Sequence, residues 1–281
     1  MDFNNYEVLA PIGNYEEIDL VLNEKPDAVY IGLKGKTSRP SVSDFSMEQL
    51  KKAIIKCHEK NIKIYVAINS NISQDAMDEL LKNIYELDRD GVDAFILADF
   101  GLIKTVSHKL KNAKIHASTL LGAYNINTVR LLKELGVTRI IFYANLYIDE
   151  IAKIINAEPD LEYELVAEGG TCFNDIRQCR LPHITDDNKH ILYCRNGCML
   201  CDENNIKKGK MIAEHPVRVA EVVGIYMGLG IKSFKIEGRT VPAKERIPMI
   251  RDLKKYIQNF ESGQPLKSYL HYVNRIRREI L

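Results

Sequence analysis

Five of the six cysteines in this 281-residue chain lie in one stretch, with the spacings C-x₆-C, C-x₁₄-C, C-x₃-C and C-x₂-C; they are Cys172, Cys179, Cys194, Cys198 and Cys201. Thiolates are soft ligands that suit zinc or iron–sulfur clusters. A zinc ribbon needs two tight cysteine pairs, and only the second half of this stretch supplies one. Four unevenly spaced thiolates with a fifth nearby fit a [4Fe–4S] cluster at least as well. Zinc, or a reduced or disulfide-linked state, remains an alternative.

Composition narrows the class of protein that carries these cysteines. The formal net charge is +1 and 46% of residues are hydrophobic, so overall basicity does not indicate nucleic-acid binding, although a local patch could bind it. The chain starts with polar residues and lacks the apolar core of a signal peptide. No apolar run reaches the ~18 residues of a membrane helix. We therefore expect a cytoplasmic protein without a membrane span, where clustered cysteines are ligands or redox groups.

The elements that must position the cysteines alternate regularly along the chain. Short β-branched runs predict strands at 6–10, 27–31, 63–68, 92–98, 114–117, 138–143, 161–167 and 233–236. Helical spacing follows these runs at 14–22, 46–60, 73–90, after 99, and at 125–135, 147–156, 216–228 and 243–260. Eight strand–helix units predict an α/β fold, a (β/α)₈ TIM-barrel-like single domain over 1–281. The cysteines form a metal-binding insertion at 168–212, after the seventh strand.

A doubly wound open sheet is the alternative fold. It would need a glycine-rich phosphate turn after its first strand, and A-P-I-G-N is not G-x-G-x-x-G. In a barrel, the C-terminal strand ends carry function, and polar residues stand at these ends; they are Asn69, Asp99, Ser118, Glu168 and Glu237. The insertion would then cover the same end of the barrel.

Two charged residues after the eighth strand are candidates for catalysis. Glu237 and Arg239 stand on either side of Gly238, and residues two apart on an extended chain point the same way. Arg239 could hold a carboxylate bidentately, and Glu237 could orient it or act as a general base. An ion pair that merely closes the barrel is the alternative. His116, on the fifth strand, is either a hydrogen-bonded core residue or a third catalytic group.

Several boxes along the chain resemble one known family. They occur in the order A-P-I-G-N, D-A-V-Y-I-G, I-H-A-S-T, the cysteine stretch and F-K-I-E-G-R, and the resemblance covers about residues 6–260. This pattern is similar to the peptidase U32 family of collagenase-like proteins. The resemblance implies a barrel-like fold and a [4Fe–4S] cluster on Cys172, Cys179, Cys194 and Cys198, with Cys201 as a possible substitute.

The same resemblance implies an activity. Family members include oxygen-independent hydroxylases of RNA bases and ubiquinone precursors, several of which are thought to take oxygen from prephenate. We therefore expect hydroxylation, or a related modification, of an RNA base or aromatic metabolite, with His116, Glu237 and Arg239 as catalytic residues. Ala144-Asn145 replaces the family's Arg-Glu after the sixth strand. This departure favours a non-catalytic, cluster-bearing subunit that works with a protein partner.

Proteolysis is the remaining alternative, because the family also carries a peptidase label. The chain has no H-E-x-x-H helix and no G-x-S-x-G elbow. A cysteine nucleophile would need a nearby histidine, and His183 and His190 lie inside the cysteine stretch. A U32-type peptidase therefore stays a second candidate.

Overall fold

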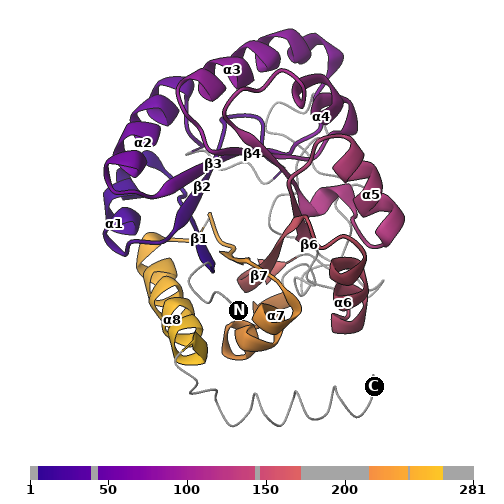
Figure 1. The fold of residues 1–281 in the computed structure, drawn as a ribbon. Helices are drawn as coiled ribbons and strands as arrows, with labels where there is room; N and C mark the ends of the chain where they lie inside the picture. Colours follow the sequence, from indigo (N-terminus) through magenta and orange to yellow (C-terminus); the bar gives the residue numbers. More distant parts are fainter. Residues whose placement is uncertain (1–5, 39–43, 143–145, 172–214, 240, 262–281) are drawn as a thin grey trace, which may run out of the picture.

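Eight parallel strands close into a barrel, with the helices on its outside (Figure 1). The computed structural model describes residues 6–38, 44–142, 146–171, 215–239 and 241–261. The strands are β1 (Glu7–Pro11), β2 (Ala28–Gly32), β3 (Lys63–Ile68), β4 (Ala94–Leu97), β5 (Lys114–Ala117), β6 (Arg139–Phe142), β7 (Glu162–Thr171), β8 (His215–Arg218) and β9 (Ser233–Ile236). The helices are α1 (Ile18–Asn23), α2 (Met47–Glu59), α3 (Met77–Arg89), α4 (Phe100–Val106), α5 (Ile126–Glu134), α6 (Ile148–Ala157), α7 (Val223–Leu229) and α8 (Ala243–Glu261).

Strand pairing confirms the expected TIM-barrel-like fold. Each strand from β1 to β6 pairs in parallel with the next along the chain, and β9 closes the ring by pairing in parallel with both β7 and β1. In the closing pair, Glu7 lies opposite Ser233. A closed parallel sheet is buried on both faces, which explains why its strands read as nearly continuous apolar runs.

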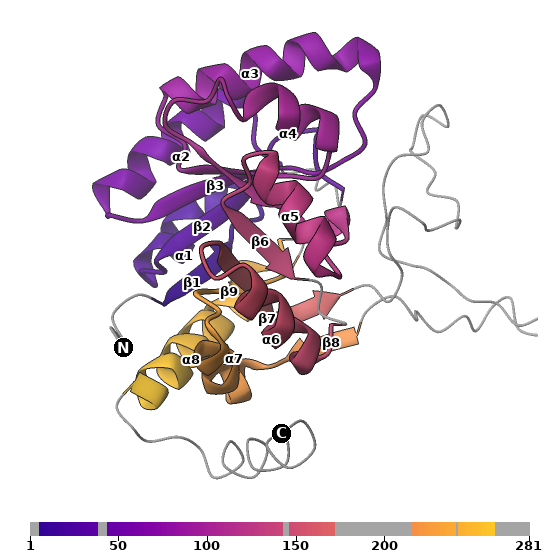
Figure 2. The same cartoon turned by 45° about the vertical axis from the view of Figure 1, so that its right-hand side comes forward.

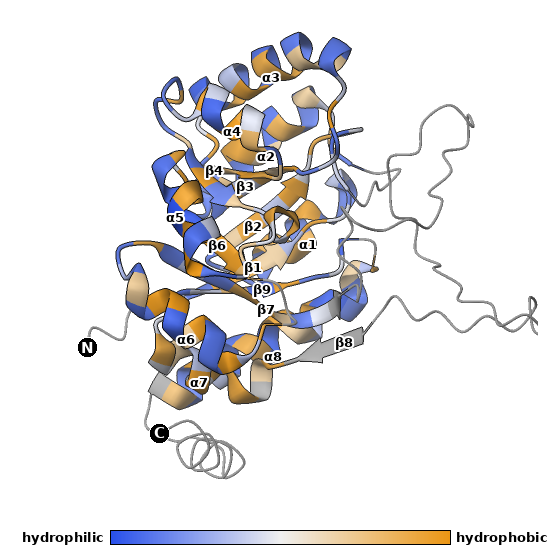
Figure 3. Ribbon diagram, turned by 90° about the vertical axis from the view of Figure 1, so that its right-hand side faces the viewer, coloured by the Kyte–Doolittle hydropathy of each residue, from blue (hydrophilic) through white to orange (hydrophobic). Residues whose placement is uncertain are grey.

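Local signals set where the helices begin. Ser46 accepts a hydrogen bond from the Gln49 amide while the Gln49 side chain accepts one from Ser46, which forms a capping box before α2. The Asp99 side chain accepts from the Leu102 amide and caps α4, and the Asn125 side chain accepts from the Thr128 amide and caps α5. The apolar side of helices such as α3 faces the strands (Figure 3). In the described part of the chain, no helix is both long and apolar enough to cross a membrane.

The segment around β8 differs from the sequence prediction. The expected strand at 161–167 continues to Thr171, and the expected helix at 216–228 is a strand, β8, followed by a 3₁₀ turn (Ala220–Val222) and then α7. β8 runs antiparallel to the end of β7, with Thr171 opposite His215 (Figure 2). Pro216 lacks an amide hydrogen, which suits an edge strand. A tertiary pairing partner therefore outweighed the local helical pattern here.

The barrel interior has an apolar layer and, nearer the strand starts, a charged layer. One small apolar cluster contains no helix residue and therefore lies inside the ring; it comprises Leu9, Ala28, Tyr30, Tyr65, Ala67, Ala94, Ile96 and Ile141. The inward positions nearer the strand starts carry charge instead, including Glu7, Arg139 and Glu164. Interior layers of such barrels consist mostly of branched apolar residues, so the charged layer is unusual for this fold.

Candidate active site

A buried ion pair organises the C-terminal end of the barrel. Arg239, just after β9, donates from Nη1 to Asp44 Oδ1 over 2.7 Å, and the two side chains are 9% and 1% exposed. Thr37 Oγ1 donates to the other oxygen of Asp44 over 2.6 Å. Asp44 thus fixes the orientation of the predicted carboxylate-binding arginine. A charge-assisted contact of this length holds the planar guanidinium more firmly than solvent would.

Two glycines explain why separate sequence boxes converge on Arg239. A Cβ at Gly32, the last residue of β2, would overlap Arg239 Nη1 and crowd Asp44. A Cβ at Gly13, in the loop after β1, would overlap the backbone carbonyl of Arg239. Close approach of other groups to these backbones requires the absence of a side chain. The boxes A-P-I-G-N, D-A-V-Y-I-G and K-I-E-G-R therefore meet at one place.

We predict that Gly32→Ala disturbs this place specifically. The added methyl group should push Arg239 away from Asp44 and lower the free energy of unfolding by about 1–3 kcal/mol, as overpacking does. Gly228→Ala is the matched control, because a Cβ there meets nothing within 4 Å inside α7. Chemical denaturation of both variants measures the difference. Equal stability of the two variants would show that the packing around Gly32 is not tight.

The cysteine stretch leaves and re-enters the barrel beside this pair. The Glu237 amide donates to the Glu168 carbonyl over 2.8 Å, which brings the end of β9 against β7. β7 then ends at Thr171, opposite the first residue of β8. The described residues that flank the cysteine stretch, Thr171 and His215, therefore lie at the same end of the barrel as Glu237 and Arg239. All five clustered cysteines lie outside the described residues. The departure at Ala144-Asn145 also lies outside the described residues.

His116 lies apart from Glu237 and Arg239. Its side chain is inside the barrel, 1% exposed, with its ring edge against Tyr65 at a centroid distance of 4.7 Å. Its Nδ1 has no hydrogen-bond partner among the described residues. The ring also lines a cavity that opens at the N-terminal end of the barrel. The structure thus brings Glu237 and Arg239 together at one end and turns His116 toward the other.

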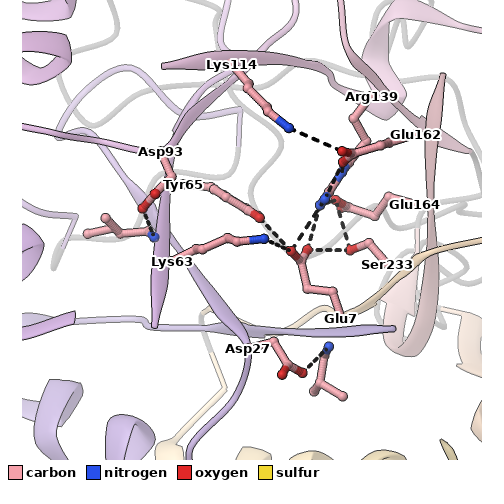
Figure 4. Close-up of polar contacts among 12 residues, drawn as sticks. Glu7, Asp27, Lys63, Tyr65, Asp93, Lys114, Arg139, Glu162, Glu164 and Ser233 are labelled. Atoms are coloured by element: carbon pink, nitrogen blue, oxygen red, sulfur yellow. Dashed lines mark hydrogen bonds and ion pairs between the residues drawn. The ribbon is translucent and has the colours of Figure 1, made fainter. Parts of the chain in front are cut away.

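A network of charged residues, here called the charged core, fills the barrel near the strand starts; it comprises Glu7, Arg139, Glu162 and Glu164, which Figure 4 shows, and Lys235. Arg139 contacts three carboxylates, at 2.6 Å to Glu7, 2.8 Å to Glu162 and 3.3 Å to Glu164. Lys235 Nζ lies 3.8 Å from Glu164 and 4.1 Å from the centroid of the Tyr30 ring. Buried charges require such partners, because desolvation is costly.

Burial and charge shift the pKa values of this network in opposite directions. Burial alone would raise the pKa of Glu7, but the charge and hydrogen bonds of Arg139 hold it below its usual value. Glu164 is completely buried and desolvation dominates there, so its pKa is raised despite Lys235 and Arg139. Burial lowers the pKa of His116 well below its usual value, and the positive charges around it add to the shift. His116 is therefore neutral in the folded protein at neutral pH.

Metal-binding capacity in the described part of the chain is limited. Within these residues, no group of three or more histidine, cysteine, aspartate or glutamate side chains is arranged to hold a metal ion. Cys57 is buried in α2, and burial raises the pKa of its thiol to about 12. A protonated thiol in such a place is neither a ligand nor a nucleophile. Any thiolate metal site must therefore come from the clustered cysteines.

Several residues at these sites were not predicted from the sequence. Asp44 and Thr37 sit in the loop after β2, where position alone does not identify an arginine partner 195 residues away. The charged core had a detectable signal, because Glu7, Arg139 and Glu164 are charged residues within strands in which most other residues are apolar. Buried charged residues are rare unless they are paired, so such charges indicate a paired, polar part of the barrel interior.

These features define the class: a (β/α)₈ barrel with a candidate site at the C-terminal strand ends, beside a cysteine-rich stretch. The family model described as peptidase family U32 matches residues 13–280. The chain therefore belongs to the U32 family. Among solved structures, it resembles the one titled "The Structure of the U32 Peptidase Mk0906", with a TM-score of 0.59 and 12% identity over 83% of this chain and 93% of that one. At this identity the likeness shows the fold alone.

Characterised relatives carry RNA-modification and collagenase names. The "tRNA hydroxylation protein P" of Haemophilus influenzae is 31% identical over 193 residues, covering 68% of this chain and 42% of the relative. The "23S rRNA 5-hydroxycytidine C2501 synthase" of Escherichia coli is 27% identical, covering 83% of this chain and 36% of the relative. The "Collagenase" of Porphyromonas gingivalis is 22% identical, covering 94% and 68%. The chain thus spans less than half the length of the two RNA-modifying relatives.

Proposed function

We propose that this protein takes part in the oxygen-independent hydroxylation of an RNA base, in the cytoplasm, with a [4Fe–4S] cluster bound by its clustered cysteines. The main support for this proposal is that relatives named for tRNA and rRNA hydroxylation align over 68% and 83% of the chain, respectively. An aromatic metabolite is the alternative substrate class.

The donor set fits the proposed cluster. The chain supplies five thiols in one stretch, and thiolates are the usual ligands of such clusters. The pairing of β7 with β8 brings the two ends of that stretch together at the rim that carries Glu237. We propose Cys172, Cys179, Cys194 and Cys198 as ligands, with Cys201 as a possible substitute. When bound, the cluster supplies redox-active iron that can also act as a Lewis acid.

The chain's own residues bind and orient the reactants in this proposal. Replacing C–H by C–OH oxidises the base carbon by two electrons, so the oxygen donor must accept them. A small carboxylate such as prephenate would serve as donor, and Arg239 would hold its carboxylate in the orientation that Asp44 fixes. Glu237 would accept a proton. His116 lines the cavity at the other barrel end, so it has no part in these roles.

Two other functions have specific support. The collagenase relative matches 94% of the chain and 68% of its own length, which favours a U32-type peptidase as the second candidate. The RNA-modifying relatives extend well beyond the aligned region, so a cluster-bearing subunit that needs a protein partner also accounts for the match. Incubation with gelatin tests for peptidase activity, and incubation with undermodified RNA tests for hydroxylation. A subunit that needs a partner should do neither by itself.

The deciding experiment compares RNA nucleosides by mass spectrometry in a deletion strain, with and without the cloned gene. We expect one hydroxylated nucleoside to vanish on deletion and to return with the wild-type chain. Arg239→Ala should restore it at least tenfold less well while the iron content stays unchanged, because the donor is no longer held. Unchanged nucleosides on deletion would refute the proposal, and full activity of Arg239→Ala would refute that residue's role.

A further inference from the structure

The cavity that His116 lines lies at the N-terminal end of the barrel, opposite Glu237 and Arg239. Its volume is about 1130 Å³, and residues at the strand starts line it, including Lys63, Lys114 and Arg139. In barrels of this class the N-terminal end usually contributes stability rather than function. The proposed hydroxylation does not use this cavity. Its volume is slightly above the ~300–1,000 Å³ of typical small-molecule sites, and its lining is more charged than theirs.

Basic side chains exceed acidic ones around this cavity. The basic residues are Lys25, Lys60, Lys63, Lys114, Arg139 and Lys232, and the acidic ones are Glu7, Asp27, Asp93 and Glu162. The acidic groups already have close partners. Asp27 accepts from the Val8 amide and Asp93 from the Ile64 amide, each over 2.8 Å. Arg139 holds Glu7 and Glu162, as Figure 4 shows.

The lysines at the rim are held less closely. Lys63 Nζ lies 3.6 Å from Glu7, and Lys114 Nζ lies 3.3 Å from Glu162. These two lysine side chains are 60% and 58% exposed, so their ammonium groups can turn toward a ligand. Lys232 lies over the Tyr6 ring at 5.0 Å from its centroid. The rim therefore offers exposed positive charge around acidic side chains that are already engaged in hydrogen bonds or ion pairs.

The floor of the cavity contains an unsatisfied polar atom. His116 Nδ1 is buried and has no hydrogen-bond partner among the described residues. Buried polar atoms are nearly always paired, so this one is an exception at the cavity wall, although the protein encloses it almost completely. Burial lowers the pKa of His116, and the nearby positive charges of Arg139, Lys114, Lys235 and Lys63 add to this shift. The same positive charges would favour an anion in the cavity.

We propose that this cavity binds a small polyanion that carries carboxylate or phosphate groups. Lys63, Lys114 and Lys232 would contact its charged groups at the rim, and the neutral His116 ring would lie at the wall beside it. Tyr65 and Arg139 also line the cavity. This site is independent of the proposed hydroxylation and of the cysteine cluster.

The test is a titration of the full chain with inorganic phosphate and, separately, citrate at constant ionic strength. Imidazole NMR signals report binding, and the His116 signal is assigned by its loss in His116→Gln. We expect a saturable shift of that signal. The double variant Lys63→Gln/Lys114→Gln should weaken binding at least about tenfold, since charge-assisted contacts are lost.

The matched control removes the same charge elsewhere. Lys82→Gln/Lys104→Gln changes exposed lysines of α3 and α4 that do not line the cavity, and it should bind as the wild type does. Equal weakening in both double variants would mean that only overall charge matters, and would overturn the proposal. Absence of a saturable shift with either anion would overturn it too. Saturation by only one anion would identify which charged group the site prefers.

Discussion

Substituting Arg139 with methionine is expected to lower the free energy of unfolding by about 3–5 kcal/mol near neutral pH, because it leaves buried carboxylates without their cation. Arg139 is 5% exposed at its side chain and contacts Glu7, Glu162 and Glu164 within 3.3 Å. Methionine is similar in length and apolar, so the loss comes from charge and hydrogen bonding rather than from a cavity. Urea denaturation measures this effect.

The pH dependence of stability should differ between the two proteins. In the wild type, Arg139 holds the pKa values of Glu7 and Glu162 below their usual value, so their contribution is full above that value and is lost as pH falls through the lowered pKa values. In Arg139→Met, Glu7 stays buried with only Lys63 at 3.6 Å and Glu164 with only Lys235 at 3.8 Å as cationic partners among the described residues, so burial should raise both pKa values. The free energy of unfolding should therefore rise more in the variant than in the wild type as pH falls from about 7.5 to about 5, since the raised pKa of Glu164 acts in this direction in both proteins.

A surface arginine provides the control for Arg139. Arg251 makes a comparable pair with Glu24 at 2.7 Å, but its side chain is 66% exposed. Solvent and salt screen such pairs, so Arg251→Met should change stability much less. If Arg139→Met were as stable as Arg251→Met near neutral pH, the charged core would not contribute to folding in the way inferred here.

Cys198→Ser is expected to abolish the iron–sulfur absorbance of anaerobically purified protein, and Cys201→Ser to retain it. This follows from the proposed ligand set, in which Cys198 binds iron and Cys201 does not, because serine is a poor replacement for a thiolate ligand. Iron and sulfide analysis with EPR spectra measures the difference. RNA hydroxylation should be lost together with the iron.

Two further outcomes distinguish the alternatives for the metal. If Cys198→Ser kept the iron–sulfur absorbance and Cys201→Ser lost it, Cys201 would be the fourth ligand in place of Cys198. If the wild-type protein contained zinc and no iron, the cysteines would form a zinc site and not an iron–sulfur cluster. Cys57→Ala serves as a control for cysteine loss, because this buried thiol lies in α2, apart from the cysteine stretch, and its raised pKa keeps it protonated. Loss of iron in this variant would contradict the assignment to the clustered cysteines.

The sequence by itself determined the architecture of this protein. Strand and helix periods recur along the chain, and capping residues such as Ser46, Asp99 and Asn125 act within a few residues of their own position. Local signals of this kind are legible because the groups that interact are neighbours in the chain. The order of the boxes likewise led to the U32 family. The one misread element, β8, forms by pairing with β7 rather than from its local pattern.

Only the tertiary structure decided which side chains meet. Closure of the barrel places Glu7 against Arg139, 132 residues later, and Asp44 against Arg239, 195 residues later. It also turns His116 toward the N-terminal cavity, away from the end that carries Glu237. Strand stagger and ring closure set these contacts, and neither appears in local periodicity. The sequence identified residues capable of chemistry, while the closed ring determined which of them share a site.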